Sequence, residues 1–407
     1  MEKRMNFFPE NGRWPSPFNQ AANPAALAGR RIRVADCTLR DGEQQAGIVL
    51  NSDDKVAIAR SLDALGIYEI EAGTVASSEE DREAIGRIVQ AGLNARISVL
   101  CRGINADIDL AHDVGVWGVR LSFPVSDIER EYKLKGVSED EYLSRALTLA
   151  EYARKRGMAV IFSPFDTTRA SLPFLRRIAA EFSRAGTVDR IRIVDTTGCA
   201  LPQAISHIVG EVVDAGNGVP VEIHCHNDFG LSCANTLAGI QAGADYVSST
   251  INGIGERCGN ASTEEVVMAL EVLYGYETGL HLERLKAMSR QVEELTGIRL
   301  SPNKAVVGEN AFRHEAGMVV AGLLKNPFTA ESYAPEIVGQ QRGILLGKKS
   351  GVVSVQHKAM QLGLDLPESA LAPVLALVKE RAVHLRRSLD DDEFVRIVEA
   401  TLAAHQS

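Results

Sequence analysis

The sequence predicts an α/β protein, a (β/α)8 TIM barrel followed by a mostly helical C-terminal extension. Eight short apolar runs alternate with amphipathic helical patterns over about residues 30–275. That stretch matches the roughly 250 residues that such a barrel needs. No glycine-rich dinucleotide loop follows the first run, which disfavours the alternative, a doubly wound open sheet.

The eight predicted strands share a short, buried and often β-branched character. They lie at residues 32–35, 68–71, 97–101, 118–123, 159–163, 190–194, 220–224 and 245–250. Helical periodicity lies between them, for example at residues 53–65, 138–156, 173–184 and 232–242. Pro173 suits the first turn of its helix, where a missing N–H group breaks no hydrogen bond.

Four parts of the chain differ in composition. Residues 1–29 are rich in Pro, Asn and Ala and are predicted to form an extended N-terminal arm. Residues 30–275 form the predicted catalytic barrel. Residues 276–352 begin with a helical pattern at 280–296, continue as glycine-rich loops, and are predicted to form a linker and lid subdomain. Residues 353–407 carry two or three helical patterns.

Composition disfavours several classes of partner, although a local basic patch remains an alternative. A net charge of -9 disfavours electrostatic binding of nucleic acid or of an anionic membrane. No run approaches the roughly 18 apolar residues of a membrane span, and the N-terminus lacks the apolar core of a signal peptide. The six cysteines contain no C-x-x-C pair and are typical of reduced thiols. A cytoplasmic location is therefore expected.

His224 and His226 form the most informative pair in the chain. Residues two apart on a strand point to the same face, so both imidazoles reach one spot, as in half of a metal site. Asp41, at the end of the first predicted strand, would add a carboxylate, and Asn260 a carbonyl oxygen. Two alternatives remain: a satisfied structural histidine pair, and a mononuclear iron oxygenase site, which the barrel fold disfavours.

Polar residues follow seven of the eight predicted strands. Active sites of such barrels lie at this rim. Arg40 could hold a substrate carboxylate or stabilise an enolate, or simply pair with Asp41 or Glu43. The hydroxyl of Thr197 could donate to a substrate or cap a turn. The other candidate site residues at strand ends are Gln44, Glu71, Ser126, Asp166 and Arg169.

Several motifs together resemble those of the homocitrate synthase and 2-isopropylmalate synthase family. They are residues 36–44, Ser126-Asp127, His224-x-His226-Asn227-Asp228-x-Gly230 and Gly253-x-Gly-Glu-Arg-x-Gly-Asn260. The resemblance spans about residues 30–352 and is closest to the bacterial homocitrate synthase branch. The chain has no room for the large C-terminal regulatory domain of many isopropylmalate synthases, so feedback of the leucine type is not expected.

The resemblance implies an activity and a set of site residues. Members condense acetyl-CoA with a 2-oxo acid, with 2-oxoglutarate as the favoured acid for this chain. A divalent metal (Zn, Mn or Mg) polarises the carbonyl. Members are dimers in which the C-terminal extension reaches over the partner's active site, so a homodimer is expected. The implied metal ligands are Asp41, His224 and His226 with Asn260 nearby, and the implied substrate contacts include Arg40, Gln44 and Thr197.

Three positions depart from the family pattern, and all three normally handle protons. Phe165 stands where the family carries a catalytic glutamate, Val319 where it carries a catalytic histidine, and Ala330 aligns with a lid tyrosine. Loss of one acid or base typically costs about 10²–10⁴ in rate. The predicted metal ligands therefore favour the activity of the family, whereas the residues at the proton-transfer positions count against it.

Several readings of these departures stay open. His314, Asp166 or Tyr333 could take over proton transfer. The scaffold could instead serve another acyl donor, retro-aldol (lyase) cleavage of a tertiary 2-hydroxy acid, or ligand binding without turnover.

The sequence also leaves two alternatives for the side chain of the substrate, one charged and one apolar. Arg102, Arg169 and Ser126 could read a distal carboxylate, as 2-oxoglutarate has, whereas Phe165 makes its wall apolar and could favour an apolar side chain.

Overall fold

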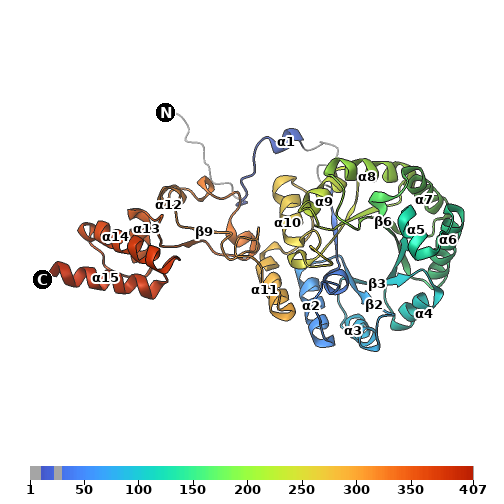
Figure 1. Ribbon diagram of the computed structural model, residues 1–407, viewed down its shortest axis with the longest axis horizontal. Helices are drawn as coiled ribbons and strands as arrows, with labels where there is room; N and C mark the ends of the chain where they lie inside the picture. The colour runs from blue at the N-terminus through green and yellow to red at the C-terminus, as the bar shows by residue number, and fades with distance from the viewer. Residues whose placement is uncertain (1–10, 23–29, 407) are drawn as a thin grey trace. The chain divides into compact units, whose positions relative to one another are not determined.

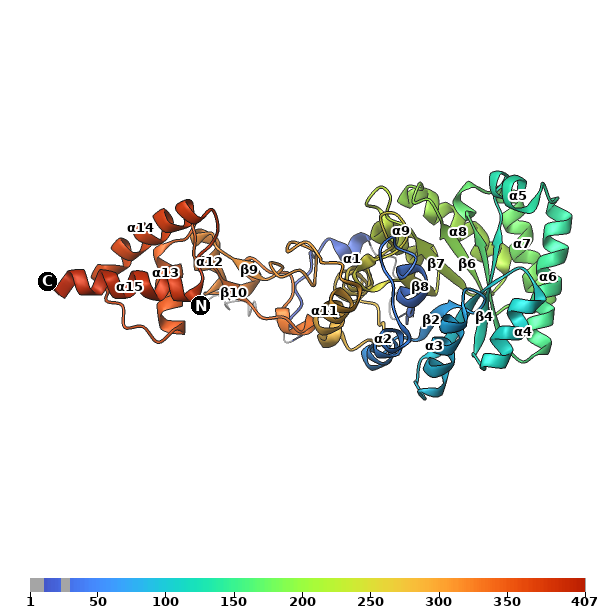
Figure 2. The same ribbon diagram turned by 60° about the horizontal axis from the view of Figure 1, so that its bottom comes forward.

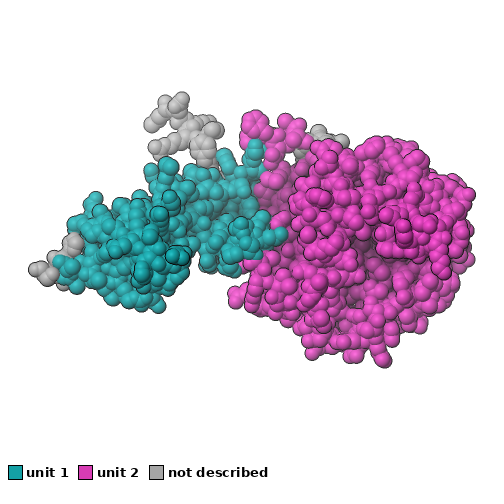
Figure 3. Space-filling view, viewed as in Figure 1, with its two compact units in different colours: residues 1–16, 301–407 teal, residues 17–300 magenta. Residues whose placement is uncertain are grey.

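The computed structural model describes residues 11–22 and 30–406. The chain divides into two compact units, one formed by Met1–Ser16 with Ser301–Ser407 and the other by Pro17–Leu300 (Figure 3). No helix of the described ranges is both long and apolar enough to cross a membrane.

The larger unit contains a closed barrel in which β1 to β8 follow one another in chain order and β8 pairs with β1 (Figure 1). All neighbouring strands are parallel. Each predicted run overlaps one observed strand, so the predicted fold class is confirmed. The strands are β1 Arg33–Asp36, β2 Glu69–Thr74, β3 Arg96–Arg102, β4 Gly118–Pro124, β5 Ala159–Phe165, β6 Arg190–Asp195, β7 Val221–Cys225 and β8 Tyr246–Ser249.

Helices surround the strands, as Figure 1 shows. They begin where the sequence offers caps: Asn51 and Asp54 form a reciprocal capping box at α2, and Pro173 lies in the first turn of α7. The helices that follow the strands in turn are α2 Ser52–Leu65, α3 Glu79–Gln90, α4 Asn105–Val114, α5 Asp127–Leu134, α6 Glu139–Lys155, α7 Leu172–Ala185, α8 Pro202–Gly216, α9 Ser232–Gln241 and α10 Thr263–Met268.

Charged side chains fill much of the barrel interior. Residues two apart on a strand face the same way, and here the inward positions carry three glutamates and three arginines, each at most 2% exposed: Glu69, Glu71, Glu222, Arg120, Arg190 and Arg192. Arg120 donates to Glu222 Oε1 and Glu69 Oε1 at 2.6 Å each. Arg192 donates to Glu222 Oε1 at 2.5 Å and to Glu71 Oε2 at 2.7 Å. Glu71 connects this network to Arg40, which follows β1 at the rim of the barrel.

The barrel unit extends beyond the predicted barrel end at residue 275. α11, Leu285–Thr296, contacts α2 and belongs to this unit. The helix predicted at 280–296 begins as a 3-10 turn, Leu282–Arg284. A single helical turn, α1 Asn19–Ala22, interrupts the arm that was predicted to be extended. The division of the chain into four parts stays a prediction, and residues 1–10 and 23–29 of the arm lie outside the described residues.

The second unit is mostly helical. Its short strands β9 Arg313–His314 and β10 Gly343–Ile344 pair in parallel and lie near α12, Gly317–Leu323 (Figure 2). Three helices follow, α13 Val352–Gln361, α14 Glu368–Leu385 and α15 Asp391–Gln406. They pack around a buried core that includes Leu346, Val355, Val374, Val378 and Phe394. The predicted helical C-terminal extension is therefore present.

Candidate metal and substrate site

Three side chains from two strand ends meet at the rim of the barrel. His224 Nε2 lies 3.3 Å from His226 Nε2 and 3.2 Å from Asp41 Oδ2, and His226 Nε2 lies 3.5 Å from the same oxygen. All three residues are at most 5% exposed. β7 positions the histidines, and a π-helical turn, Thr38–Gly42, positions Asp41 after β1. The side chains that the sequence singled out therefore lie together, while their role as metal ligands stays a prediction.

The ionisation states of this group suit metal binding. Burial lowers the pKa of His224, and burial together with the charge of His224 lowers the pKa of His226 to about 4. Both imidazoles are therefore neutral near pH 7 and keep a lone pair, as ligands must. Burial opposes ionisation of Asp41, but Arg40 and His224 outweigh it and hold the pKa of that carboxyl well below its usual range. His224 Nδ1 lies 3.1 Å from Ser248 Oγ, which leaves Nε2 facing Asp41.

Asn260 adds a fourth candidate donor. Its backbone forms a β-bridge with His226, and its Nδ2 donates to the Ile254 carbonyl at 3.1 Å. Its Oδ1 is buried and has no hydrogen-bond partner among the described residues, as is also true of Asp41 Oδ2. Unpaired buried oxygens are rare and costly. Two such oxygens beside two neutral imidazoles form a donor set that fits a divalent cation.

Two glycines make the position of Asn260 possible. A Cβ atom on Gly255 would lie 2.1 Å from Asn260 Nδ2, and one on Gly259 would lie 1.9 Å from the Gly253 carbonyl oxygen. Both glycines have positive φ angles, 153° and 86°. The glycines of this loop therefore admit the close packing that holds Asn260 beside His226.

Cys37 lies beside the site, and sequence reasoning missed it. Within the described part of the chain, ligand atoms of Cys37, Asp41 and His224 lie within 4.8 Å of one another. The Cys37 thiol donates to the Ser249 carbonyl at 3.3 Å and lies 4.0 Å from His224 Nδ1, the nitrogen that does not face Asp41. Burial raises the pKa of this thiol far above its usual value. We therefore interpret Cys37 as support for the imidazole, since a thiol ligand must be deprotonated.

Arg40 forms ion pairs with two acidic side chains, Glu71 and Asp41. Its Nε donates to Glu71 Oε1 at 2.6 Å, and its Nη1 lies 3.2 Å from Asp41 Oδ1 and 3.3 Å from Gln44 Oε1. Burial opposes the charge on Arg40, but Glu71 and Asp41 raise the pKa of the guanidinium. The other oxygen of Glu71 accepts from Arg192, so Glu71 orients Arg40 and links it to the interior network. The structure thus brings together Arg40, Gln44 and Glu71, three predicted substrate contacts.

A second polar cluster lies at the ends of β4 and β5. Ser126 donates to Asp166 Oδ2, and Arg169 Nε donates to Asp166 Oδ1 at 2.8 Å. The backbone N–H of Asp166 donates to Thr196 Oγ1 at 2.7 Å, and its φ angle of 64° is left-handed. Both oxygens of Asp166 are occupied, which favours a structural role over that of a base. Thr197 Oγ1, in contrast, is buried without a hydrogen-bond partner among the described residues.

The remaining proton-transfer candidates belong to the other unit. His314 Nε2 lies 3.3 Å from Glu331 Oε1. Arg342 donates to the two oxygens of Glu331, from Nε at 2.8 Å and from Nη2 at 2.6 Å. Sequence reasoning missed Glu331, although it adjoins Ala330. Tyr333 packs edge-on against Phe312, and burial raises its pKa to about 12, which makes its hydroxyl a poor base near neutral pH.

Comparisons with known proteins place the chain among related families and relatives. A family model described as HMGL-like matches residues 31–292, and one described as homocitrate synthase post-HMGL domain-like matches residues 306–386. The chain is 44% identical to homocitrate synthase AksA of Methanopyrus kandleri over 388 residues, which cover 94% of this chain and 96% of that protein. It is 43% identical to (R)-citramalate synthase CimA of Methanocaldococcus jannaschii over 367 residues, which cover 90% of this chain and 74% of that protein.

A solved structure shares the fold. The hydroxymethylglutaryl-CoA lyase from Pseudomonas aeruginosa aligns with a TM-score of 0.59 at 20% identity, covering 67% of this chain and 95% of that chain. At this identity the likeness concerns the barrel fold alone.

Proposed function

Since this chain belongs to the HMGL-like family and is a homologue of the homocitrate, citramalate and isopropylmalate synthases, we propose that its barrel site condenses acetyl-CoA with a 2-oxo acid at a bound divalent metal. The chain is an acyltransferase of this synthase type. The observation that carries the metal-site proposal is the convergence of Asp41, His224 and His226 beside the unpaired oxygen of Asn260.

The residues of the rim have two proposed roles, metal binding and stabilisation of negative charge. Asp41, His224, His226 and Asn260 would hold the metal. When bound, it supplies Lewis-acid polarisation of the 2-oxo acid carbonyl. Arg40 keeps its charge because Glu71 and Asp41 flank it, so its guanidinium can stabilise negative charge that develops on a carbonyl oxygen.

For proton transfer we favour His314 over the two other candidates. Glu331 orients its imidazole, and Arg342 neutralises Glu331, so a proton can be taken up at the nitrogen that faces away from Glu331. Asp166 has both oxygens occupied and Tyr333 has a raised pKa. Dimer formation, through which the extension of one chain would serve its partner, is part of this proposal.

The identity of the 2-oxo acid is a finer question. Arg102, Arg169 and Ser126 are the predicted readers of a distal carboxylate such as that of 2-oxoglutarate. Arg102 donates from Nε and Nη2 to Asp107 at 2.9 and 3.0 Å, and Arg169 and Ser126 both donate to Asp166. The similarity to a homocitrate synthase supports 2-oxoglutarate, whereas the similarity to a citramalate synthase points to a different product.

One observation favours a second candidate function. Phe165, Val319 and Ala330 carry no titratable group at positions where the family handles protons. The same metal and oxyacid site could therefore serve retro-aldol cleavage of a tertiary 2-hydroxy acid, or condensation with a different acyl donor.

The deciding experiment is thiol release from acetyl-CoA by metal-loaded protein with 2-oxoglutarate, 2-oxoisovalerate, pyruvate or oxaloacetate. We expect thiol release that requires both the metal and one of these acids. Release of a 2-oxo acid from a 2-hydroxy acid without CoA would support the lyase instead. No thiol with any acid, from protein that contains about one metal ion per chain, would contradict the condensation.

A further inference from the structure

The last residue of β5 faces the inside of the barrel. Phe162 packs outward, with its ring centroid 4.4 Å from that of Phe182 on α7. Because side chains alternate along a strand, Ile161, Ser163 and Phe165 face the opposite way, towards the barrel axis. Phe165 is the last of this series, so its ring lies at the rim where the candidate site is.

The neighbouring strands extend this apolar surface. Pro124 on β4 pairs with Phe165, and Val194 on β6 pairs with His224 on β7. Paired residues of parallel strands share a face. The pairing of Ile161 with Arg190, continued four residues along both strands, places Phe165 opposite Val194, so the three apolar residues follow one another around the rim as far as His224. Pro124 and Val194 are buried, whereas Phe165 is half-buried.

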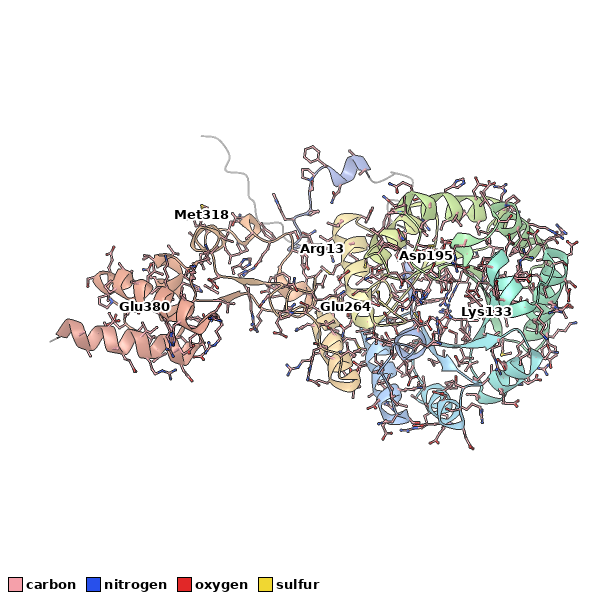
Figure 4. The ribbon with its side chains drawn as sticks, in the orientation of Figure 1. Arg13, Lys133, Asp195, Glu264, Met318 and Glu380 are labelled. Carbon is pink, nitrogen blue, oxygen red and sulfur yellow. The ribbon has the colours of Figure 1, made fainter. Side chains whose placement is uncertain are left out.

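Three cations of this part of the rim have acidic partners. Lys133 on α5 is labelled in Figure 4. Its Nζ lies 2.6 Å from Glu129 Oε2 and 4.8 Å from the centroid of the Phe165 ring. Arg169 donates to Asp166, and Arg192 donates to Glu71 and Glu222. A ligand carboxylate on this wall would have to compete for these cations, and a buried charge without a partner is costly.

We propose that Phe165, together with Pro124 and Val194, forms the pocket for the side chain of the 2-oxo acid, and that this pocket selects an uncharged aliphatic side chain over a distal carboxylate. The inference rests on the proposed function, because it assumes that a 2-oxo acid binds at the metal. It gives Phe165 a role as a specificity-determining residue in place of the carboxylate that the family carries there.

The test separates binding from turnover. Metal-loaded full-length protein is titrated by calorimetry with 2-oxoisovalerate and with 2-oxoglutarate, without acetyl-CoA, and thiol release is measured in parallel. We expect 2-oxoisovalerate to bind at least about 10-fold more tightly, within the 10–200-fold range that an apolar pocket discriminates. Phe165→Arg should reverse this order, and Phe165→Leu should preserve it. Tyr132→Ala, which removes an aromatic ring that is 82% exposed on α5, is the matched control and should change neither affinity.

The outcomes separate the two proposals. A preference for 2-oxoisovalerate without thiol release would support the pocket and count against the condensation. Thiol release with 2-oxoglutarate as the preferred acid would support the condensation and overturn the pocket. Equal affinities, no binding of either acid, or an unchanged preference in a folded Phe165→Arg variant would also overturn it.

Discussion

The metal side of the barrel rim and the positions of Phe165, Val319 and Ala330 differ sharply in chemistry. On the metal side, buried acidic, imidazole and guanidinium groups meet within hydrogen-bonding range. At the other three positions, where the resemblance implies proton-transfer groups, the side chains cannot titrate. The proposed function therefore assigns two tasks to different residues: binding of the metal and the oxyacid to the barrel rim, and proton transfer to side chains elsewhere.

The largest effect is expected from removing a metal ligand. His224→Gln should reduce the bound metal from about one ion per chain to a small fraction and lower kcat/KM by well over the roughly 100-fold that supporting residues cost. Elemental analysis of the dialysed protein measures this directly. His207→Gln, an exposed histidine on α8, is the matched control, and equal metal contents in the two variants would contradict the assignment.

Proton transfer should depend on His314. His314→Gln is expected to lower kcat by about 10²–10⁴ while the metal content stays unchanged, because His314 is held by Glu331 and not by the metal side. Steady-state kinetics of His314→Gln, Asp166→Asn and Tyr333→Phe compares the three candidates. A larger loss of kcat in either of the latter two would transfer the role to that residue.

Arg40→Lys should have a smaller effect than the loss of His314. Lysine keeps the charge but cannot donate to Glu71 from one atom while approaching Asp41 with another. We expect a fall of about 10²-fold in kcat/KM, similar to the loss of one donor that stabilises an oxyanion. An unchanged rate with intact metal content would show that the guanidinium has only a structural role.

The buried network below the rim should affect stability more than a surface pair does. Glu222→Gln leaves arginines without their buried partner and should lower the free energy of unfolding by about 3–5 kcal/mol. Chemical denaturation measures this change. The control is Glu211→Gln, which breaks a partly exposed pair with Arg176 and should cost at most about 1 kcal/mol. Similar losses in both variants would count against the network.

The sequence predicted the barrel well because apolar runs and helical periodicity are local signals. It also brought His224, His226 and Asp41 to one place, because strand alternation and barrel topology determine which strand ends meet. The interior network was missed because alternation assigns a face to Arg190 or Arg192 but does not identify partners across the barrel.

Other parts of the site depended on contacts that no local pattern encodes. The Glu331–Arg342 pair joins residues 11 positions apart through folded loops. Ser126 donates to Asp166 although the two residues are 40 positions apart in the sequence. This hydrogen bond counts against the predicted role of Asp166 as a base, and no local sequence pattern indicates it.

The most direct test of the proposed metal site is anomalous diffraction from crystals of the metal-loaded protein. We expect one strong peak at about 2.0–2.2 Å from Asp41 Oδ2, His224 Nε2 and His226 Nε2. A peak at another site, or none at this one in protein that carries about one metal ion per chain, would contradict it.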